Sequence, residues 1–371
     1  MVATTDADGD GRLDVELGTL QKYGGVPVIF FPRTFSEAFK WSGPLASWVS
    51  AHVGGFDVVH IHAMFSHSSV VSAHACHRTG VPYLVRPLGQ LDPWSLGHHR
   101  LRKQLLLRCG AASMLQRASA IHYTTEAERS LAEQQLPWLP NGLVVPLGID
   151  DDWFAQRGDQ APVDRYVLAM ARLHEKKGFD LLIDAFHALA ESNRCADWAL
   201  VIAGDGTPNE VERLKKRAAS GAARTRISFR GWVSGADRLS LVAGAALFAL
   251  PSHQENFGLA VAEAMATGVP ALVSPEVNLA SLIERAQAGW VVVRDLAAWV
   301  GALSAALEDP ADREQRGRRA RSAAERFRWA VVGRELSDMY DGLLRRHPAP
   351  LRVSSQRTSP GRVIPAGRAE R

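Results

Sequence analysis

Residues 245–270 constrain the fold of this chain more than any other segment. The first six, 245–250, are apolar and stop at Pro251, as expected for a short buried strand. A polar loop follows at 252–256, and residues 257–267 then have the composition of a helix that ends before Gly268. This order predicts a strand–loop–helix unit. The start of such a helix presents unpaired backbone N–H groups, which attract an anion such as phosphate.

Short apolar strands alternate with helices along most of the chain, in two series. The first series ends at an acidic turn near residues 148–152, and the second begins at the apolar segment 166–171. This alternation is typical of parallel, doubly wound sheets, so the expected class is α/β with two Rossmann-like domains. Two such domains in series predict a ligand cleft at the carboxyl ends of their strands. The predicted parts are a domain at 1–150, a domain at 151–328, an amphipathic helix at 329–346 and a disordered basic tail at 347–371.

Composition narrows the class of protein. With 371 residues, 46% of them hydrophobic, the chain can form two packed cores. No apolar run reaches the roughly 18–20 residues needed to cross a membrane, and the first residues are too polar for a secretory signal. Three scattered cysteines predict a reducing, cytoplasmic environment without disulfides. The arginine-rich tail is explained by a solvated end, with contact to the inner face of the plasma membrane as the alternative. No nucleic-acid partner is predicted.

Two carboxylates lie in the strand–loop–helix unit of residues 245–270. Glu255 lies in the loop and Glu263 in the helix, with seven residues between them, so both can face one ligand. The stretch Glu-Asn-Phe-Gly-Leu-Ala-Val-Ala-Glu, with Pro-Ser before it and a Gly-x-Pro stop after it, resembles the Glu-x7-Glu segment of the retaining glycosyltransferases of family 4, the group 1 glycosyltransferases. The resemblance extends from about residue 2 to 346. It implies the GT-B fold, in which two Rossmann-like domains face a cleft and the last helix returns to the N-terminal, acceptor-side domain.

The resemblance also implies roles for particular residues. Arg172 and Lys177, in the loop after strand 166–171, would neutralise the diphosphate of the leaving nucleotide, for which a guanidinium fork and an ammonium are suited. Glu255 would bind the donor sugar near the reacting carbon, and Glu263 the ribose hydroxyls. The substrate-binding set is completed by the backbone near the helix start, by glycine turns at strand ends and by the segment that meets the nucleobase: Asn256, Phe257, Gly258, Leu259, Gly204, Gly231, Trp232 and Val233.

The N-terminal half offers fewer markers. His62 ends the strand expected at 56–62 and resembles a family position that faces donor or acceptor; Arg86 is the expected polar group on the acceptor side, because Leu88 stands where many relatives carry His or Arg. A zinc site among the nearby histidines is the rival interpretation, but they lack tight ligand spacing, and no metal is predicted. The acidic run that begins at Asp6 resembles the start of a calcium loop, yet residue 17, where the bidentate acid belongs, is leucine. A polar loop is expected there.

One departure from the family concerns the start. The family opens with a strand and a glycine-rich loop over the diphosphate, ahead of the strand that residues 2–5 resemble, and neither is found in this chain. The N-terminal domain is therefore expected to lack them. Either the start codon is assigned too far downstream, or the chain is a remnant.

The implied activity is transfer of a sugar from a UDP- or GDP-linked donor to a polysaccharide, glycolipid or other glycan acceptor, with retention at the anomeric carbon. No second carboxylate is placed as a nucleophile, so the family's front-face mechanism is expected. Besides the nucleotide sugar as co-substrate, no cofactor is expected. The alternatives are a catalytically impaired nucleotide-binding remnant and a sugar-nucleotide epimerase of the same fold.

Overall fold

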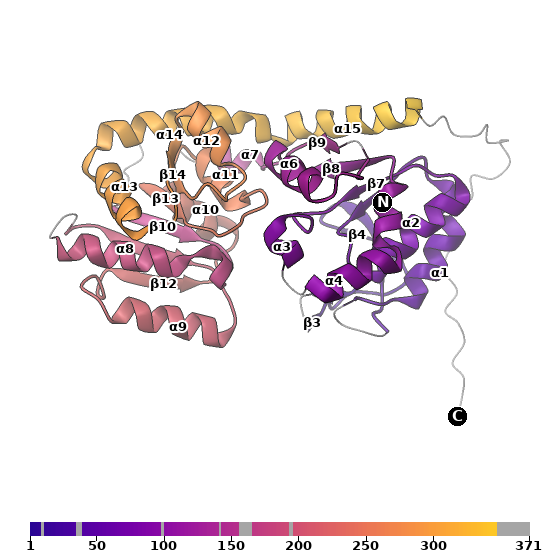
Figure 1. Ribbon diagram of the computed structural model, residues 1–371, viewed down its shortest axis with the longest axis horizontal. Coiled ribbons are helices and arrows are strands. Elements are labelled where there is room, and N and C mark those ends of the chain that lie inside the picture. Colours follow the sequence, from indigo (N-terminus) through magenta and orange to yellow (C-terminus); the bar gives the residue numbers. More distant parts are fainter. Residues whose placement is uncertain are drawn as a thin grey trace. The chain divides into compact units, whose positions relative to one another are not determined.

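In the computed structural model the chain folds into two compact units (Figure 1). The residues that the structure describes are 1–8, 11–34, 39–97, 100–140, 142–155, 165–192 and 196–346, so the tail predicted at 347–371 lies outside them. Unit 1 comprises Met1–Tyr123, Arg129–Val144 and the chain from Ser337 onward, and unit 2 comprises Thr124–Glu128 and Val145–Leu336.

The first half of the chain contains nine strands and six α-helices in its described part. In chain order they are β1 (Val2–Thr5), β2 (Ala7–Asp8), β3 (Gly11–Arg12), β4 (Leu20–Tyr23), β5 (Val26–Phe31), α1 (Gly43–His52), β6 (Val59–His62), α2 (His67–Thr79), β7 (Tyr83–Arg86), α3 (Pro93–Gly97), α4 (Arg100–Leu106), α5 (Ala112–Gln116), β8 (Ala120–Tyr123), α6 (Glu126–Gln135) and β9 (Gly142–Val144).

The sheet structure of unit 1 is split. β1, β5 and β4 form one sheet, and β6, β7, β8 and β9 form another, in those orders. Pairing within these two sheets is parallel except between β4 and β5, and β2 and β3 form a separate antiparallel pair. Within the described residues, β1 pairs only with β5 and β6 only with β7, so each sheet has an edge without a neighbouring strand.

Two local features of unit 1 are not evident from the sequence pattern. A π-helical turn at Leu107–Ala111 separates α4 from α5, and Gly110 within it has φ +134°. The loop that begins at Asp6 is held by contacts within the protein. Asp6 is buried and lies 3.6 Å from Arg33 Nε, and its Oδ1 accepts the backbone N–H of Arg33 at 2.9 Å. Its carboxylate therefore anchors the loop internally.

The second half continues with α7 (Asp151–Ala155), β10 (Tyr166–Met170), α8 (Phe179–Glu191), β11 (Ala199–Ala203), α9 (Pro208–Ala219), β12 (Ile227–Gly231), α10 (Gly235–Ala243), β13 (Leu247–Leu250), α11 (Leu259–Ala266), β14 (Ala271–Val273), α12 (Ala280–Ala286), β15 (Gly289–Val291), α13 (Leu296–Glu308), α14 (Pro310–Ala324) and α15 (Trp329–Arg346). The helix α15 contributes to both units, because unit 2 ends at Leu336 and unit 1 resumes at Ser337. Within the described ranges, no helix has both the length and the apolar character needed to span a membrane.

Unit 2 is built on one parallel sheet with the order β12-β11-β10-β13-β14-β15. Alternation along β10 shows how both faces are buried. Val167 and Ala169 pack with α8 and α13, whereas Leu168 and Met170 pack with α11 and α14 (Figure 1). Because side chains of a strand point alternately to its two faces, an uninterrupted apolar strand requires helices on both sides. The sequence pattern of unit 2 therefore corresponds to a doubly wound sheet.

The strand order reverses beside β10. The chain passes from β10 outward through β11 and β12, and β13 then returns to the other side of β10. At such a reversal the loops after the two central strands diverge, which opens a crevice at their carboxyl ends. The loops after β10 and β13 are therefore the places where a ligand site is expected in unit 2.

Candidate functional site

The loops after β10 and β13 are packed against each other. The backbone N–H of His253 donates to the carbonyl oxygen of Lys176 at 2.8 Å. Gly178 has φ +66°, and a Cβ at that position would lie inside van der Waals contact of the Pro251 carbonyl oxygen. Glycine thus permits this approach. The two loops that the sequence singles out form one continuous surface at the strand reversal.

An ion pair joins the two loops. Lys177 Nζ contacts Glu255 Oε2, with 14% and 18% of the two side chains exposed. Two backbone hydrogen bonds hold Glu255 itself, from its N–H to Glu276 O and from Asn278 N–H to its carbonyl, both 3.0 Å. Arg172, on the same loop as Lys177, is exposed and forms no ion pair with a described residue. Two cations and one carboxylate therefore surround the carboxyl end of β10.

Asn256 and Phe257 connect this loop to α11. The Asn256 side chain donates through Nδ2 to Thr124 Oγ1 at 3.3 Å, while its Oδ1 is buried and has no partner within the described residues. Phe257 is 3% exposed and packs edge-on against Phe327, with ring centroids 5.3 Å apart. Because its ring belongs to the core, Phe257 can reach a ligand only through its backbone.

Gly258 sets the start of α11, which begins at Leu259, two residues later than the sequence pattern predicts. With φ +81°, Gly258 is the N-cap and has no side-chain cap. The first N–H groups of the helix are therefore not satisfied by a capping side chain and remain available to an anion.

Glu263 is the second predicted carboxylate, and it is almost fully buried. Its side chain is 4% exposed, and its Oε2 forms an ion pair with the Arg238 guanidinium from α10. Burial raises the pKa of Glu263 to about 7, although the charge and hydrogen bond of Arg238 act in the opposite direction. Arg238 also lies over the ring of Trp153, 5.3 Å from its centroid.

No motif in the sequence pointed to Arg238. It lies 25 residues from Glu263, on a different helix, and an arginine on a predicted amphipathic helix is usually part of its solvent face. No local spacing rule connects the two side chains.

A pocket of about 240 Å³ brings together several of the predicted residues with Arg238. Arg172, Gly204, Trp232 and Val233 line it beside the arginine. Trp232 is 77% exposed, so its indole ring is free to cover a ligand. Gly231, at the end of β12, accepts the backbone N–H of Gly204 at 2.8 Å. Lys177, Glu255 and Asn256 do not line this pocket, and they mark a neighbouring part of the same loop surface.

We expect Gly204→Ala to lower the free energy of unfolding of unit 2 by about 2–4 kcal/mol. Gly204 has φ +131°, and a Cβ there would overlap the carbonyl oxygen of Ala171 on the neighbouring loop. Gly231→Ala is the matched control, because it has φ +66° but no heavy atom within 4 Å of the added Cβ. That variant should lose only about 1–2 kcal/mol, the cost of the left-handed backbone. Urea unfolding of both variants measures the difference, and equal losses would contradict the steric argument.

In unit 1, His62 and Arg86 lie side by side at the ends of β6 and β7, where they are register partners. The Arg86 charge and, above all, partial burial lower the pKa of His62. The neighbouring His60 contacts Tyr340 OH through Nδ1 (2.8 Å) and His122 Nδ1 through Nε2 (3.1 Å). Burial is the main cause that lowers the pKa of His60 to about 2, so it is neutral at physiological pH.

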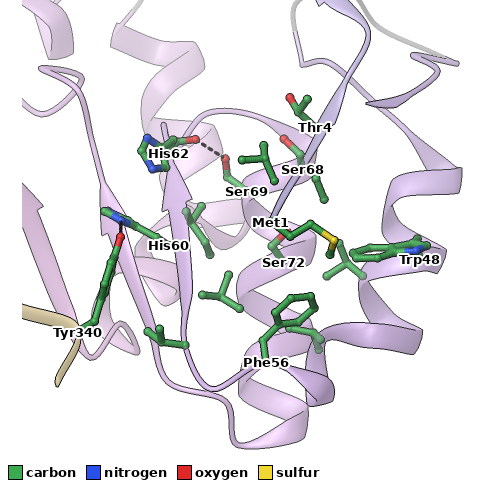
Figure 2. A pocket seen from close by; sticks show the side chains of 17 residues that line it. Met1, Thr4, Trp48, Phe56, His60, His62, Ser68, Ser69, Ser72 and Tyr340 are labelled. Atoms are coloured by element: carbon green, nitrogen blue, oxygen red, sulfur yellow. Dashed lines mark hydrogen bonds between the residues drawn. The ribbon is translucent and has the colours of Figure 1, made fainter. Parts of the chain in front are cut away.

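Figure 2 shows both histidines beside a groove of about 600 Å³ in unit 1. The groove is lined by residues 1–4, which include the start of β1, on one side and by β6 on the other, and both strands lie at sheet edges. The His62 carbonyl accepts a long hydrogen bond from Ser69 Oγ at 3.5 Å.

Of the histidines in the zinc interpretation, His60 and His62 are neighbours, with ring centroids 4.5 Å apart, whereas His67 has other partners. His67 is buried and stacks on Trp41 with ring centroids 3.7 Å apart, and its Nδ1 accepts the backbone N–H of Ser42 at 3.3 Å. In the part of the chain that the structure describes, no three His, Cys, Asp or Glu side chains are grouped as metal ligands.

Comparison with known proteins gives matches in both units. The family described as glycosyl transferases group 1 matches residues 153–323, and the glycosyl transferase 4-like domain matches residues 2–148. A GDP-mannose:cellobiosyl-diphosphopolyprenol alpha-mannosyltransferase of Komagataeibacter xylinus is 27% identical over 355 residues, 90% of this chain and 86% of that protein. The mannosylfructose-phosphate synthase of Agrobacterium fabrum is 35% identical over 144 residues, but the match spans only 35% of this chain and 32% of that relative.

The fold is shared with solved structures. HepE of Anabaena, crystallised with UDP and glucose, superposes with a TM-score of 0.69 over 86% of this chain and 87% of that one, at 19% identity. The two family matches lie on the two units, one on each side of residues 148–153. The chain belongs to the group 1 glycosyltransferases of family 4, and its fold is GT-B.

Proposed function

We propose that the chain transfers a sugar from a nucleotide diphosphate sugar to a glycan or lipid-linked acceptor, with retention and without a metal. The observation that carries the proposal is the arrangement at the strand reversal of unit 2, where Arg172, the Lys177–Glu255 pair and the uncapped start of α11 surround one surface. An arriving diphosphate would compete with Glu255 for Lys177. Glu255 would then be released toward the hydroxyls of the donor sugar.

The nucleoside is assigned to the neighbouring pocket. Trp232 and the backbone near Gly231 would contact the nucleobase. Glu263, which lies within α11, would accept hydrogen bonds from the ribose hydroxyls. This assignment is supported by the fact that the pocket and α11 adjoin, because Ala260 of α11 lines it. The proposal includes both UDP- and GDP-linked sugars as donors.

The proposed reaction uses these placements. The bond between the anomeric carbon and the phosphate oxygen breaks, and a bond to the acceptor oxygen forms on the same face of the sugar. The departing phosphate oxygen receives the acceptor proton. Arg172, Lys177 and the N–H groups of α11 would stabilise the charge that grows on the diphosphate. Such fixed positive groups perform the role that a metal has in other transferases.

The acceptor is proposed from similarity alone. The Komagataeibacter relative, which aligns over 90% of this chain, is named for a diphosphopolyprenol-linked acceptor. A lipid-linked acceptor would bring the protein to a membrane surface. In unit 1, His62 and Arg86 are the proposed groups for donor and acceptor contacts.

We expect Glu263→Ala to weaken nucleotide binding about tenfold or more, because a charged hydrogen bond contributes about 1.5–3 kcal/mol. Calorimetric titration of wild type and variant with UDP and with GDP measures this. Unchanged affinity in the variant would contradict the ribose role.

The same preparation separates the alternatives. Nucleotide release that depends on an added acceptor supports the transferase, and NMR of the product anomer tests retention. The nucleotide-binding remnant is the second candidate. Nucleotide binding without any transfer would support it. Conversion of a donor sugar in the absence of acceptor would instead indicate an epimerase.

A further inference from the structure

Arg238 is the charged residue of the pocket that the proposed reaction leaves without a role. Its guanidinium is fixed on two sides, by the ion pair with Glu263 Oε2 and by the Trp153 ring 5.3 Å away. Its side chain is 31% exposed and lines the pocket that also contains Arg172 and Trp232. A guanidinium clamped in this way holds its partner in one orientation.

We propose that Arg238 is a positioning residue for nucleotide binding, which holds Glu263 as an oriented carboxylate whose second oxygen accepts the ribose hydroxyls of a nucleoside diphosphate sugar. The inference rests on the proposed function of unit 2. Arg238 engages Oε2, and no other side chain of the described residues forms a hydrogen bond or ion pair with the Glu263 carboxylate. One oxygen is thus fixed while the other remains available.

The surroundings of Glu263 explain why a positioning cation is needed. Burial favours the protonated acid and raises the pKa of Glu263 to about 7. A protonated carboxyl would offer the ribose a weaker acceptor. Arg238 opposes this effect, and its removal would raise the pKa of Glu263 further.

Other charges near Glu263 come from the elements packed on α11. Asp150, which precedes α7, also raises the pKa of Glu263. In α7 itself, Asp151 pairs with Arg328, and Asp152 is exposed. In α14, Arg321 donates to the Ala266 carbonyl at 3.3 Å. The adjoining strands β13 and β14 consist of apolar residues. Arg238 is therefore the one cation in the described residues that contacts the Glu263 carboxylate.

The test is the affinity for UDP and GDP, measured by calorimetry between pH 5.5 and 9 in wild type, Arg238→Gln and Arg238→Lys. Wild-type affinity should fall about tenfold per pH unit below a midpoint near 7, because only the ionised fraction of Glu263 binds well. In Arg238→Gln the midpoint should move up by one unit or more, so that affinity is about tenfold lower at pH 7 and recovers near pH 9. Arg238→Lys should retain most of the wild-type profile.

Arg316→Gln is the matched control, because Arg316 likewise pairs with a carboxylate, Asp312 at 2.8 Å, and lies over an indole, Trp290 at 4.5 Å. It lines no part of the pocket, and its variant should keep the wild-type pH profile. Near-UV circular dichroism verifies that each variant is folded.

Three results would overturn the inference. A loss in Arg238→Gln that is the same at every pH would indicate a merely structural role, and an unchanged midpoint would exclude control of Glu263. In both cases wild-type binding is intact, so the proposed function survives. If wild type binds neither nucleotide at any pH, the proposed function fails and this inference fails with it.

Discussion

Lys177→Met is expected to reduce the rate of sugar transfer by a factor of about 10²–10³, the usual loss when one preorganised charge partner of a transition state is removed. Lys177 lies at the carboxyl end of β10 and is held by Glu255 from the facing loop. In the transition state the diphosphate gains charge, and an ammonium fixed beside it stabilises that state more than the bound donor. The loss should therefore appear mainly in kcat, measured by nucleotide release with a saturating donor.

Lys176→Met provides the comparison. Lys176 adjoins Lys177 in the same short helical turn, Glu175–Lys177, so the variant removes the same charge from the same loop. Its rate should stay within a few-fold of wild type. Equal losses in the two variants would mean that the general positive potential of the loop matters, and not the position of Lys177.

The second large effect concerns stability. Glu263→Gln is expected to raise the free energy of unfolding by about 3–4 kcal/mol above pH 7 and to change it little near pH 4, even though the variant should bind nucleotide poorly. Burial raises the pKa of Glu263 to about 7 from an ordinary value of 4.5. Each unit of such a shift corresponds to about 1.4 kcal/mol between the two protonation states.

The direction of this pH dependence is set by the folded protein, which binds the proton of Glu263 more tightly than the unfolded chain does. Below pH 4.5 the carboxyl is protonated in both states, so its ionisation does not change the free energy of unfolding. Between pH 4.5 and 7 the unfolded chain releases the proton while the folded protein retains it, and wild-type stability falls as pH rises. Above pH 7 the full cost of a buried carboxylate is present. Glutamine removes that cost because it is uncharged.

Urea unfolding at pH 4, 6 and 8.5 measures this dependence. Glu284→Gln is the control, since Glu284 is exposed on α12 and should change stability by less than about 0.5 kcal/mol at any pH. A Glu263→Gln variant that is less stable than wild type at pH 8.5 would show that the ion pair with Arg238 outweighs the burial of the charge.

The second prediction describes a site in which one buried carboxylate acts against the stability of the fold. At neutral pH the charge of Glu263 is expected to cost stability that a neutral side chain of similar shape would not. Under the proposed function, the donor nucleotide would supply the missing hydrogen bonds and compensate for this cost.

Local sequence was sufficient for much of unit 2. The apolar runs predict β10 and β13, because strands buried on both faces must be apolar throughout. The position of Glu255 in a loop between a strand and a helix follows from Pro251 and from the helical pattern that begins near Gly258. These features depend on residues close together in the chain, and so spacing alone identifies them.

Contacts between residues that are far apart in the sequence were decided only by the tertiary structure. Phe257 stands in the motif but lies in the core against Phe327, 70 positions along the chain, so only its backbone is available. Asp6 looks like a metal ligand in sequence, yet it is buried against Arg33. The Arg238–Glu263 pair joins two helices that have no local relation. Each of these contacts exists only after the chain is packed.

The sequence by itself thus determined the family, the alternation of strands and helices, and the loops that hold Arg172, Lys177 and Glu255. All of these follow from short-range patterns of polarity and of glycine. Only the tertiary structure decided the charge state of Glu263 and the role of its arginine partner. The physical reason is that the energy of a buried charge depends on its whole surroundings, and those are assembled from distant segments.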